Sequence, residues 1–347
     1  IRELLLKKAS ENFNWSEISP TIFGAVFEST LNPETRRKGG MHYTSIENIH
    51  KVIDPLFLDD LKAELAQIKE ITVARTQERR LREFQNKLAS LTFLDPAAGS
   101  GNFLTETYLS LRRLENEVLE ILSKGQISFG DIDYNPIRVS ISQFYGVEIN
   151  DFAVTVARTA LWIAESQMMK ETESIVRMHL DFLPLKTNAN IVEGNALRMD
   201  WESVVPKHKL SYIMGNPPFV GKKEQSPEQK KELTELYGKG ISGVGNMDYV
   251  TGWYIKAAEY MNETKIHAAF VSTNSITQGE QPPVLWTKLK NYNVNIIFAY
   301  RTFVWASEAN MKAHVHCVII GFCDYAPTEK RRIYFDMRYT MADNINP

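Results

Sequence analysis

Cysteine is scarce in this chain, and neither sign of charge is in clear excess. The 347 residues include two cysteines, Cys317 and Cys323, close together in one apolar segment. Two cysteines are too few for a disulfide framework, so the sequence predicts a reducing compartment, the cytoplasm. Forty basic residues against 42 acidic ones leave a formal charge of −2, which excludes a basic field over the whole molecule. A nucleic-acid partner would have to contact a local patch, or a part of the protein outside this chain.

Long hydrophobic runs are absent as well. No apolar stretch approaches the roughly 18 residues that a membrane-spanning helix needs, so we expect no membrane partner. The first residues, Ile1 to Lys8, have neither the apolar core nor the cleavage site of a signal peptide. An initiator methionine is also missing, and we therefore expect the chain to be a piece of a longer protein.

The first ninety residues are predicted to be helical. Residues 1–35 carry apolar side chains at helical spacing. A further helix is predicted to start near Ser45, where Thr44 and Glu47 have the spacing of a capping box. Residues 58–90 are highly charged with a helical pattern, which is typical of an exposed helical hairpin.

Short apolar strands alternate with helices from residue 91 onward. Helices are expected at residues 103–122, 152–169 and 248–261. The predicted strands are residues 91–94, 144–149, 190–194, 211–214, 267–272, 295–300 and 314–322. This alternation implies crossover connections, and hence an α/β fold with a mostly parallel sheet and helices on both faces. Ligands of such sheets bind at the carboxyl ends of the strands.

A glycine-rich loop, Asp95 to Phe103, directly follows the first predicted strand. Gly99 and Gly101 let the backbone come close to a ligand where a side chain would collide, and the next helix presents free N–H groups there. Asp95 can pair with an ammonium group of a ligand. A Gly-x-Gly pair by itself is equally compatible with a structural strand–helix turn.

An acidic residue, Glu148, ends the next predicted strand. A carboxylate at that place can accept hydrogen bonds from both hydroxyls of a ribose. A solvated acid at a strand end is the alternative explanation.

A second loop, Asn216-Pro217-Pro218-Phe219, follows the strand at 211–214. The two prolines restrict the backbone and remove two N–H donors. The carbonyl of Pro217 and the side-chain oxygen of Asn216 are left as two rigid acceptors, which match an exocyclic amine with two N–H donors. Phe219 offers a flat face on which a heterocycle can stack. An ordinary proline turn is the alternative.

In this order, the two loops resemble those of the class I S-adenosylmethionine-dependent methyltransferases that methylate amino groups in DNA. Residues 95–103 resemble the cofactor loop of that family, and residues 216–219 its catalytic tetrapeptide. Residues 40–44 resemble its N-terminal cofactor-contacting segment, and their position before both loops is typical of the gamma type. The helix at 103–122 and the segment 145–150 are most similar to the adenine-methylating module of single-chain type IIG/IIL restriction–modification enzymes.

The resemblance implies a Rossmann-like catalytic domain at residues 91–325. A helical connector with the cofactor-contacting segment would occupy residues 1–90, and residues 326–347 would begin a truncated target-recognition region. It also implies S-adenosyl-L-methionine as cofactor, and double-stranded DNA as partner. The reaction would methylate the N6 amino group of a flipped adenine, within a restriction–modification or phage-defence protein. The remaining target-recognition region and any nuclease would lie outside this chain.

Family roles transfer to the residues that match. Asn216, Pro217, Pro218 and Phe219 would be the catalytic residues. The cofactor would be contacted by Tyr43, Thr44, Asp95, Ala97, Gly99, Gly101, Asn102, Phe103, Glu148, Ile149, Asn195 and Ala196. Within that set, Glu148 would bind the ribose hydroxyls and Ile149 would pack on the adenine ring. Asn195 would meet the adenine amino group; many relatives have Asp there, but an asparagine can still accept from an amine.

Several alternatives stay open. Protein glutamine and RNA guanine methyltransferases share the tetrapeptide but usually end it with Tyr, so Phe219 and the segment around Tyr43 favour DNA. Cytosine N4 is also compatible, because the tetrapeptide binds an amine rather than a whole base. A non-catalytic scaffold of a restriction complex would not need both loops. His314, His316 and Cys317 alternate along an apolar strand, which favours sheet packing, and we expect no metal site.

Overall fold

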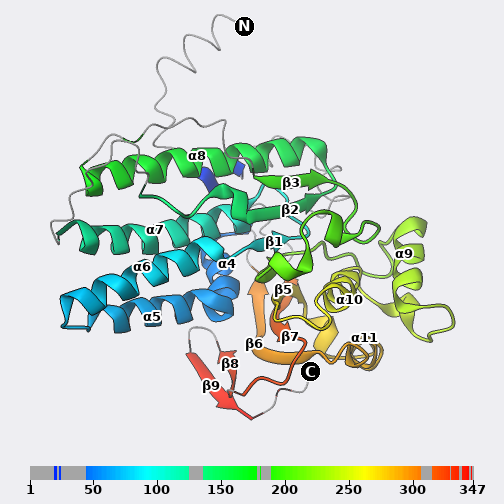
Figure 1. The fold of residues 1–347 in the computed structure, drawn as a ribbon. Helices are drawn as coiled ribbons and strands as arrows, with labels where there is room; N and C mark the ends of the chain where they lie inside the picture. The colour runs from blue at the N-terminus through cyan, green and yellow to red at the C-terminus, as the bar shows by residue number, and fades with distance from the viewer. Residues whose placement is uncertain are drawn as a thin grey trace, which may run out of the picture.

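The computed structural model describes residues 19–21, 23–24, 44–124, 136–177, 180, 189–305, 315–328, 330–335, 338–343 and 345. The helix expected over residues 1–35 lies largely outside these ranges, and Tyr43 lies outside them entirely. Within the described part, the strands form one twisted sheet that is covered by helices on both faces (Figure 1). The α/β fold predicted from the sequence is confirmed.

The sheet has the strand order β3-β2-β1-β4-β5-β7-β6-β8-β9. The strands are β1 (Phe93–Asp95), β2 (Phe144–Glu148), β3 (Asn190–Glu193), β4 (Tyr212–Gly215), β5 (His267–Thr273), β6 (Asn295–Trp305), β7 (Val315–Cys323), β8 (Arg331–Phe335) and β9 (Arg338–Ala342). Pairing is parallel from β3 to β5 and between β6 and β8. β7 runs antiparallel between β5 and β6, and β9 is antiparallel to β8. The sheet is therefore mostly parallel, as expected.

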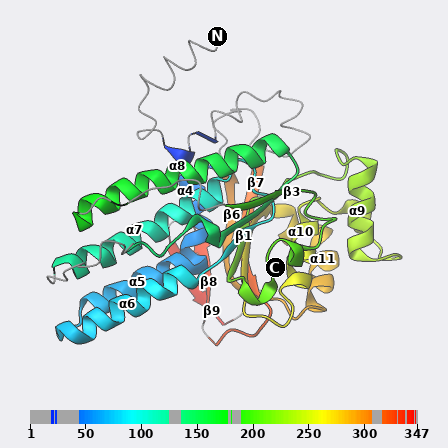
Figure 2. The ribbon, with the colours of Figure 1, turned by 45° about the horizontal axis from the view of Figure 1, so that its top comes forward.

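The helices form two layers, one on each face of the sheet (Figure 2). One layer contains α4 (Ile46–Ile53), α5 (Asp59–Lys69), α6 (Ala74–Ser90), α7 (Asn102–Lys124) and α8 (Asp151–Val176). The other contains α9 (Pro227–Tyr237), α10 (Thr251–Tyr260) and α11 (Gln281–Lys290). Consecutive residues of a strand point to opposite faces, so Phe93 packs in the core beneath the first layer and Leu94 in the core beneath the second.

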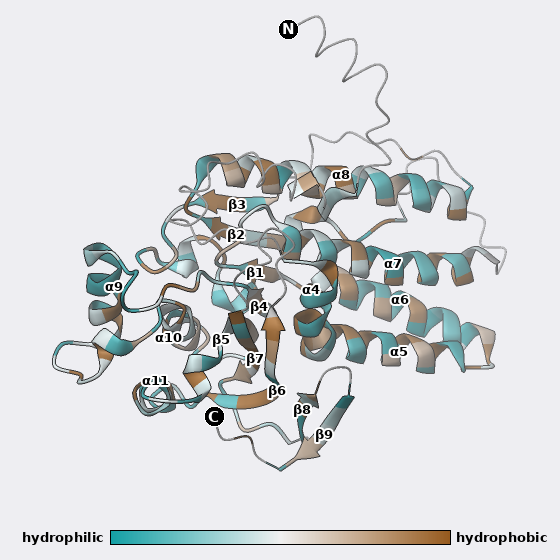
Figure 3. Cartoon of the chain, turned by 180° about the vertical axis from the view of Figure 1, so that it is seen from behind, coloured by the Kyte–Doolittle hydropathy of each residue, from teal (hydrophilic) through white to brown (hydrophobic). Residues whose placement is uncertain are grey.

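The helical segment before the sheet begins at a different cap from the one expected. The hydroxyl of Ser45, not that of Thr44, accepts from the N–H of Asn48 at the start of α4. A π-helical turn containing Pro55 then joins α4 to α5. The predicted hairpin at 58–90 is formed by α5 and α6, whose polar and apolar residues alternate in Figure 3. Their apolar side chains are buried in the first-layer core, so this hairpin is part of the domain.

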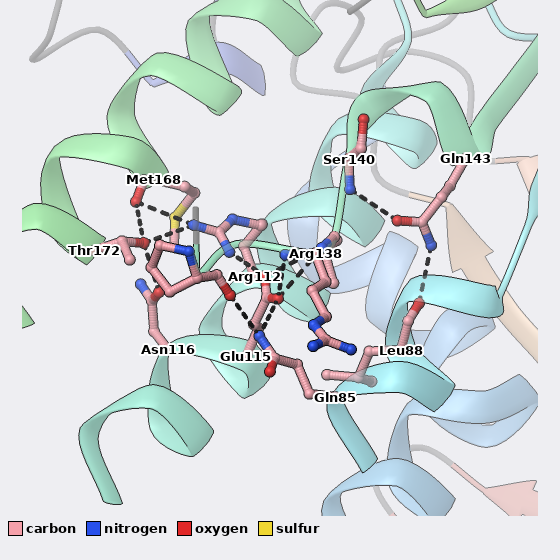
Figure 4. Close-up of polar contacts among 12 residues, drawn as sticks. Gln85, Leu88, Arg112, Glu115, Asn116, Arg138, Ser140, Gln143, Met168 and Thr172 are labelled. Atoms are coloured by element: carbon pink, nitrogen blue, oxygen red, sulfur yellow. Dashed lines mark hydrogen bonds and ion pairs between the residues drawn. The ribbon is translucent and has the colours of Figure 1, made fainter. Parts of the chain in front are cut away.

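A buried polar network fastens the first layer together (Figure 4). The guanidinium of Arg112 on α7 pairs with the carboxylate of Glu115 and donates to Thr172 Oγ1 on α8 at 2.6 Å. Glu115 Oε1 also accepts from Gln85 Nε2 on α6 at 2.8 Å and from the backbone N–H of Arg138 at 2.7 Å. Removing one partner of a buried ion pair costs about 3–5 kcal/mol, because it leaves an uncompensated buried charge. Here the pair on α7 connects α6 and α8 to the segment at Arg138 that leads into β2.

Some elements do not follow from the sequence patterns. The helices α9 and α11 are not predicted, because each buries only a few apolar side chains among polar ones. β8 pairs with β6, so the sheet extends beyond residue 325, the predicted end of the catalytic domain. Across the described ranges, no helix is long and apolar enough to span a bilayer.

Candidate active site

A cleft opens at the carboxyl ends of β1, β2, β3 and β4. Its empty volume, which includes space open to solvent, is about 870 Å³. The cleft brings together Thr44, Asp95, Ala97, Gly99, Asn102, Phe103, Glu148, Ile149, Asn195, Ala196, Asn216 and Pro218 from the predicted set. Most of the residues singled out in the sequence therefore line one cavity.

Asp95 ends β1 and is almost completely buried. Its Oδ1 accepts from the N–H of Ala97 at 3.0 Å, whereas Oδ2 has no hydrogen-bond partner within the described structure. Burial raises the pKa of Asp95 to about 7, and the neighbouring Glu148 adds to the rise. A Cβ at Gly215 would lie 2.5 Å from Oδ1, so the aspartate fits only because β4 ends in glycine. One buried carboxylate oxygen is thus left for a ligand.

The two glycines of the loop have different roles. Gly99 has φ +53° and donates its N–H to Glu148 Oε2 at 2.8 Å. Gly101 has φ +82° and is not among the residues that line the cleft. A Cβ at Gly101 would approach the Cβ of Ala157 on α8 to 2.8 Å. Gly101 therefore allows the turn and its close packing on α8.

Glu148 ends β2 with its carboxylate held by the backbone. Oε2 accepts from Gly99 N–H, and Oε1 accepts from Asn150 N–H at 3.0 Å. Burial raises the pKa of Glu148, and the backbone hydrogen bonds oppose that rise. The next residue, Ile149, is 58% exposed beside the cleft. A fixed carboxylate next to an apolar side chain suits a hydroxylated ring system with a flat aromatic part.

Asn195 follows β3, and both ends of its amide are engaged. Oδ1 accepts from the N–H of Leu197 at 2.9 Å, and Nδ2 donates to Glu232 Oε1 on α9 at 2.9 Å. Glu232 was not predicted, nor were the lining residues Gln229, Tyr249 and Trp253. The spacing of Ser226 and Gln229, which form a capping box at the start of α9, is the local signal that could have revealed this helix.

Asn216 follows β4 and faces the N-terminal segment. Its Nδ2 donates to Thr44 Oγ1 at 3.2 Å, and its Oδ1 is buried with no hydrogen-bond partner in the described ranges. Pro218 lines the cleft, Pro217 is buried, and Phe219 is half-buried against both cores. Neither Pro217 nor Phe219 is among the lining residues. The loop thus holds one buried, unpaired acceptor, Asn216 Oδ1, on a residue that lines the cleft.

The loop is anchored on its far side by Asp248. Oδ1 of Asp248 accepts from the N–H of Val220, directly after the tetrapeptide, and from the N–H of Val250, both at 3.1 Å. Oδ2 accepts from Thr273 Oγ1 at 3.2 Å. Burial raises the pKa of Asp248, and these hydrogen bonds oppose that rise. The tetrapeptide is therefore tied to the start of α10 and the end of β5.

Of the residues considered as metal ligands, the structure describes His316 and Cys317. His316 is exposed near the start of β7 rather than packed in the sheet, and His314 lies outside the described residues. Cys317 is buried, and burial raises the pKa of its thiol to about 12. Within the part of the chain that the structure describes, no three His, Cys, Asp or Glu side chains gather as metal ligands.

The cleft fits the chemistry of S-adenosylmethionine. The unpaired oxygen of Asp95 can accept from an ammonium group, and Glu148 can accept from ribose hydroxyls. Ile149 offers an apolar surface, and Asn195 offers an amide oxygen to an amino group. Each of these groups has a counterpart in the amino acid, ribose or adenine part of the cofactor.

Comparisons with known proteins agree with this arrangement. The family model described as "MmeI, DNA-methyltransferase domain" matches residues 71–335. DNA methyltransferase A of Bacillus subtilis (strain 168) is 39% identical over 346 residues, 99% of this chain and 38% of the relative. A putative type II restriction enzyme and methyltransferase of Methanocaldococcus jannaschii is 27% identical over 60% of this chain and 19% of its own length.

Among solved structures, the type IIL restriction–modification enzyme MmeI in complex with DNA superposes with a TM-score of 0.89. It is 42% identical, and the match covers 99% of this chain and 45% of that one. The chain thus spans less than half the length of these two relatives, DNA methyltransferase A and MmeI.

Proposed function

Because the chain belongs to the family of MmeI DNA-methyltransferase domains, we propose that it methylates the N6 amino group of adenine in duplex DNA. The methyl donor is S-adenosyl-L-methionine, and the chain is the methyltransferase module of a longer restriction–modification protein. The observation that carries this proposal is the buried, unpaired Oδ1 of Asn216 beside a cleft with acceptors for the cofactor.

The cofactor is held by residues from three strand ends. Asp95 receives the ammonium group, Glu148 the ribose hydroxyls, and Asn195 the adenine amino group, with Ile149 against the ring. Thr44 and the loop from Ala97 to Phe103 complete the cleft, and we assign Tyr43 to the same segment as Thr44. When bound, the cofactor supplies an electrophilic methyl group on its sulfonium sulfur.

The tetrapeptide positions the acceptor amine. The lone pair of an adenine amino nitrogen is delocalised into the ring, so the nitrogen is a poor nucleophile. Hydrogen bonds from that NH₂ group to Asn216 Oδ1 and the Pro217 carbonyl draw the nitrogen toward tetrahedral geometry and stabilise the developing positive charge. Alignment of the amine with the methyl group is the main catalytic effect. The base must leave the duplex to reach this site, and Phe219 stacks on it.

The DNA contacts are expected to be shared with other parts of the protein. The relatives include a restriction–modification enzyme in complex with DNA, and the charge of this chain is −2. Phosphate contacts can therefore come from local basic patches of this chain as well as from the rest of the longer protein. We place the recognition surface mainly in the rest of the longer protein.

Nucleoside mass spectrometry of host DNA tests the proposal. The whole protein is expressed in a host without DNA methylation, as wild type, as Asn216→Ala, and as Asn291→Ala, which removes an exposed asparagine at the end of α11. We expect N6-methyladenine with the wild type and the Asn291 variant. Asn216→Ala is expected to abolish it while cofactor binding persists, since the side chain acts on the amine.

The other outcomes correct or overturn the proposal. N4-methylcytosine would keep the residue roles and change the base. Methylation at a near wild-type rate by Asn216→Ala would refute the mechanism. No methylated base in DNA, with cofactor binding retained, would favour an RNA or protein amine as substrate, and no cofactor binding would favour a scaffold.

A further inference from the structure

A buried carboxylate lies directly behind the cleft. Glu232 on α9 is 6% exposed, and its oxygens accept from three side chains. These donors are Asn195 Nδ2 at 2.9 Å, the guanidinium of Arg198 and the hydroxyl of Tyr249. Gln229, one turn earlier on the same face of α9, lines the cleft, as do Asn195 and Tyr249. The proposed mechanism gives Glu232 no role.

The contacts of Asn195 fix which end of its amide points where. The backbone N–H of Leu197 is a donor, so the atom that it meets must be Oδ1. A carboxylate only accepts, so the atom that meets Glu232 must be Nδ2. The two contacts agree, and a flipped amide would lose both. Oδ1 has a second lone pair, so it can accept one more hydrogen bond from a ligand in the cleft.

The charge at Glu232 also decides which residue position 195 tolerates. An aspartate there would place a carboxylate oxygen about 3 Å from Glu232 Oε1, where an N–H now lies. Like charges at hydrogen-bond distance disfavour joint ionisation. Arg198 is the cation paired with Glu232, and its side chain is 60% exposed. One exposed cation compensates poorly for two adjacent carboxylates, so an amide, not an acid, fits beside Glu232.

We propose that Glu232 is a positioning residue for the cofactor, and that it selects and orients the Asn195 amide so that Oδ1 receives the adenine amino group. This inference rests on the proposed function in one respect, namely that the cleft binds S-adenosylmethionine. It assigns α9 a part in cofactor recognition, although the helix follows the catalytic tetrapeptide in the chain. Glu232 and Asn195 are predicted to act as one unit. A carboxylate at either position is tolerated if the other position carries an amide, but carboxylates at both positions are not.

Binding of S-adenosyl-L-homocysteine, the demethylated form of the cofactor, tests this unit by isothermal titration calorimetry on the whole protein. The variants are Asn195→Asp, Glu232→Gln and the double variant that moves the charge from 232 to 195. The matched control is Glu235→Gln on the same helix, where the side chain is 65% exposed. S-inosyl-L-homocysteine is the second probe, because it carries an oxo group in place of the amino group.

We expect Asn195→Asp to weaken binding of S-adenosyl-L-homocysteine at least tenfold, and Glu232→Gln by threefold or less. The double variant should return to within threefold of the wild type, whereas adding Glu235→Gln to Asn195→Asp should restore nothing. The wild type should prefer the amino over the oxo probe at least tenfold. Asn195→Asp should lose most of that preference and the double variant should regain it, which a purely structural role of Glu232 would not produce.

Two results would overturn the inference while the proposed function stands. One is wild-type affinity in Asn195→Asp, and the other is a double variant that binds no better than that single variant. If Asn195→Asp does not fold, the double variant decides. Folding and binding within threefold of the wild type would support the inference, and failure to do so would overturn it. A wild type that binds neither S-adenosyl-L-homocysteine nor S-adenosylmethionine would overturn the proposed function, and this inference with it.

Discussion

Two buried oxygens on residues that line the cleft lack a hydrogen-bond partner among the described residues: Asp95 Oδ2 and Asn216 Oδ1. An unpaired buried acceptor costs about 1–3 kcal/mol, so most folded proteins leave few of them. Their gathering in one cleft means that a ligand with N–H or O–H groups recovers this cost on binding. Replacing a residue that holds one of these oxygens in place should therefore affect ligand binding or catalysis.

Thr44 is such a residue, because its hydroxyl accepts a hydrogen bond from Nδ2 of Asn216. Replacement by valine keeps the shape but removes the acceptor for Asn216 Nδ2, so the amide is free to turn its N–H toward the amine. We expect Thr44→Val to lower kcat for methylation by about 10- to 100-fold. The loss in affinity for S-adenosyl-L-homocysteine should be smaller, and single-turnover kinetics with calorimetry separates the two.

Thr44→Ser is the control, because it keeps the hydroxyl and removes one methyl group. It should retain most of the wild-type kcat. If Thr44→Val and Thr44→Ser were equally active, the contact with Asn216 would have no part in catalysis.

At the scale of the elements, α4 positions Thr44 at the cleft, because Thr44 directly precedes the Ser45 cap of this helix. The helix starts at the Ser45 cap and is joined to α7 through His50. His50 Nδ1 lies 2.8 Å from Asp54 Oδ1, and Nε2 lies 3.4 Å from Glu106 Oε1. The hydrogen bonds to Asp54 and Glu106 raise the pKa of His50 to about 9, although burial opposes the rise. The imidazole is therefore charged at neutral pH and links the two helices.

This link makes a pH-dependent contribution to stability. Since the folded pKa lies above the unfolded value of about 6.5, the contribution is complete below about pH 6.5 and is lost as the pH rises through about 9. Its size should be about 1–3 kcal/mol, because the side chain is partly exposed. Urea unfolding of wild type and His50→Gln should show a gap in free energy of unfolding at pH 6.5 that closes by pH 10.

Subtracting the free energy of unfolding of His50→Gln from that of the wild type cancels the contributions of other titrating groups. Asp95, with its pKa of about 7, is one of these groups. A gap of the same size at both pH values would show that the imidazole contributes by packing and not by charge.

At the scale of the whole molecule, the cleft lies at the point where the strand order of the sheet reverses, between β1 and β4. β2 and β3 are added on one side of β1, and β4 and β5 on the other. The loops after β1 and β4 consequently diverge to opposite faces and leave a crevice between them. Ligand binding there connects the two helical layers, so it should stabilise the folded chain as a unit.

Thermal unfolding of the whole protein measures this stabilisation. S-adenosyl-L-homocysteine at about 100 times its Kd should raise the free energy of unfolding by about 2.7 kcal/mol, which appears as a Tm increase of a few degrees. Glu148→Ala should lose most of this increase at the same ligand concentration.

Glu193→Ala is the matched control for that experiment. Glu193 ends the neighbouring strand in register with Glu148, but it is exposed and outside the lining of the cleft. It should keep the full increase in Tm. An equal response of Glu148→Ala and Glu193→Ala would exclude Glu148 from cofactor binding.

Much of the site could be predicted from the sequence because its signals are local. An apolar strand followed by Asp95 and the glycine loop, or by Asn216 and two prolines, identifies a strand end and its chemistry within ten residues. Since carboxyl ends of parallel strands share one edge, these loops had to meet. The capping signal was less specific, because Thr44 and Ser45 are adjacent hydroxyl residues and only packing decides which of them caps α4.

What the sequence by itself determined is therefore the α/β alternation, the strand-end residues and the family. The tertiary structure alone decided the partnerships between residues far apart in the chain. These include Thr44 with Asn216, 172 residues later, Asn195 with Glu232, and Gly101 against Ala157 on α8. Such contacts have no periodicity along the chain, because they depend on how whole elements pack, and it is this packing that orients the predicted side chains.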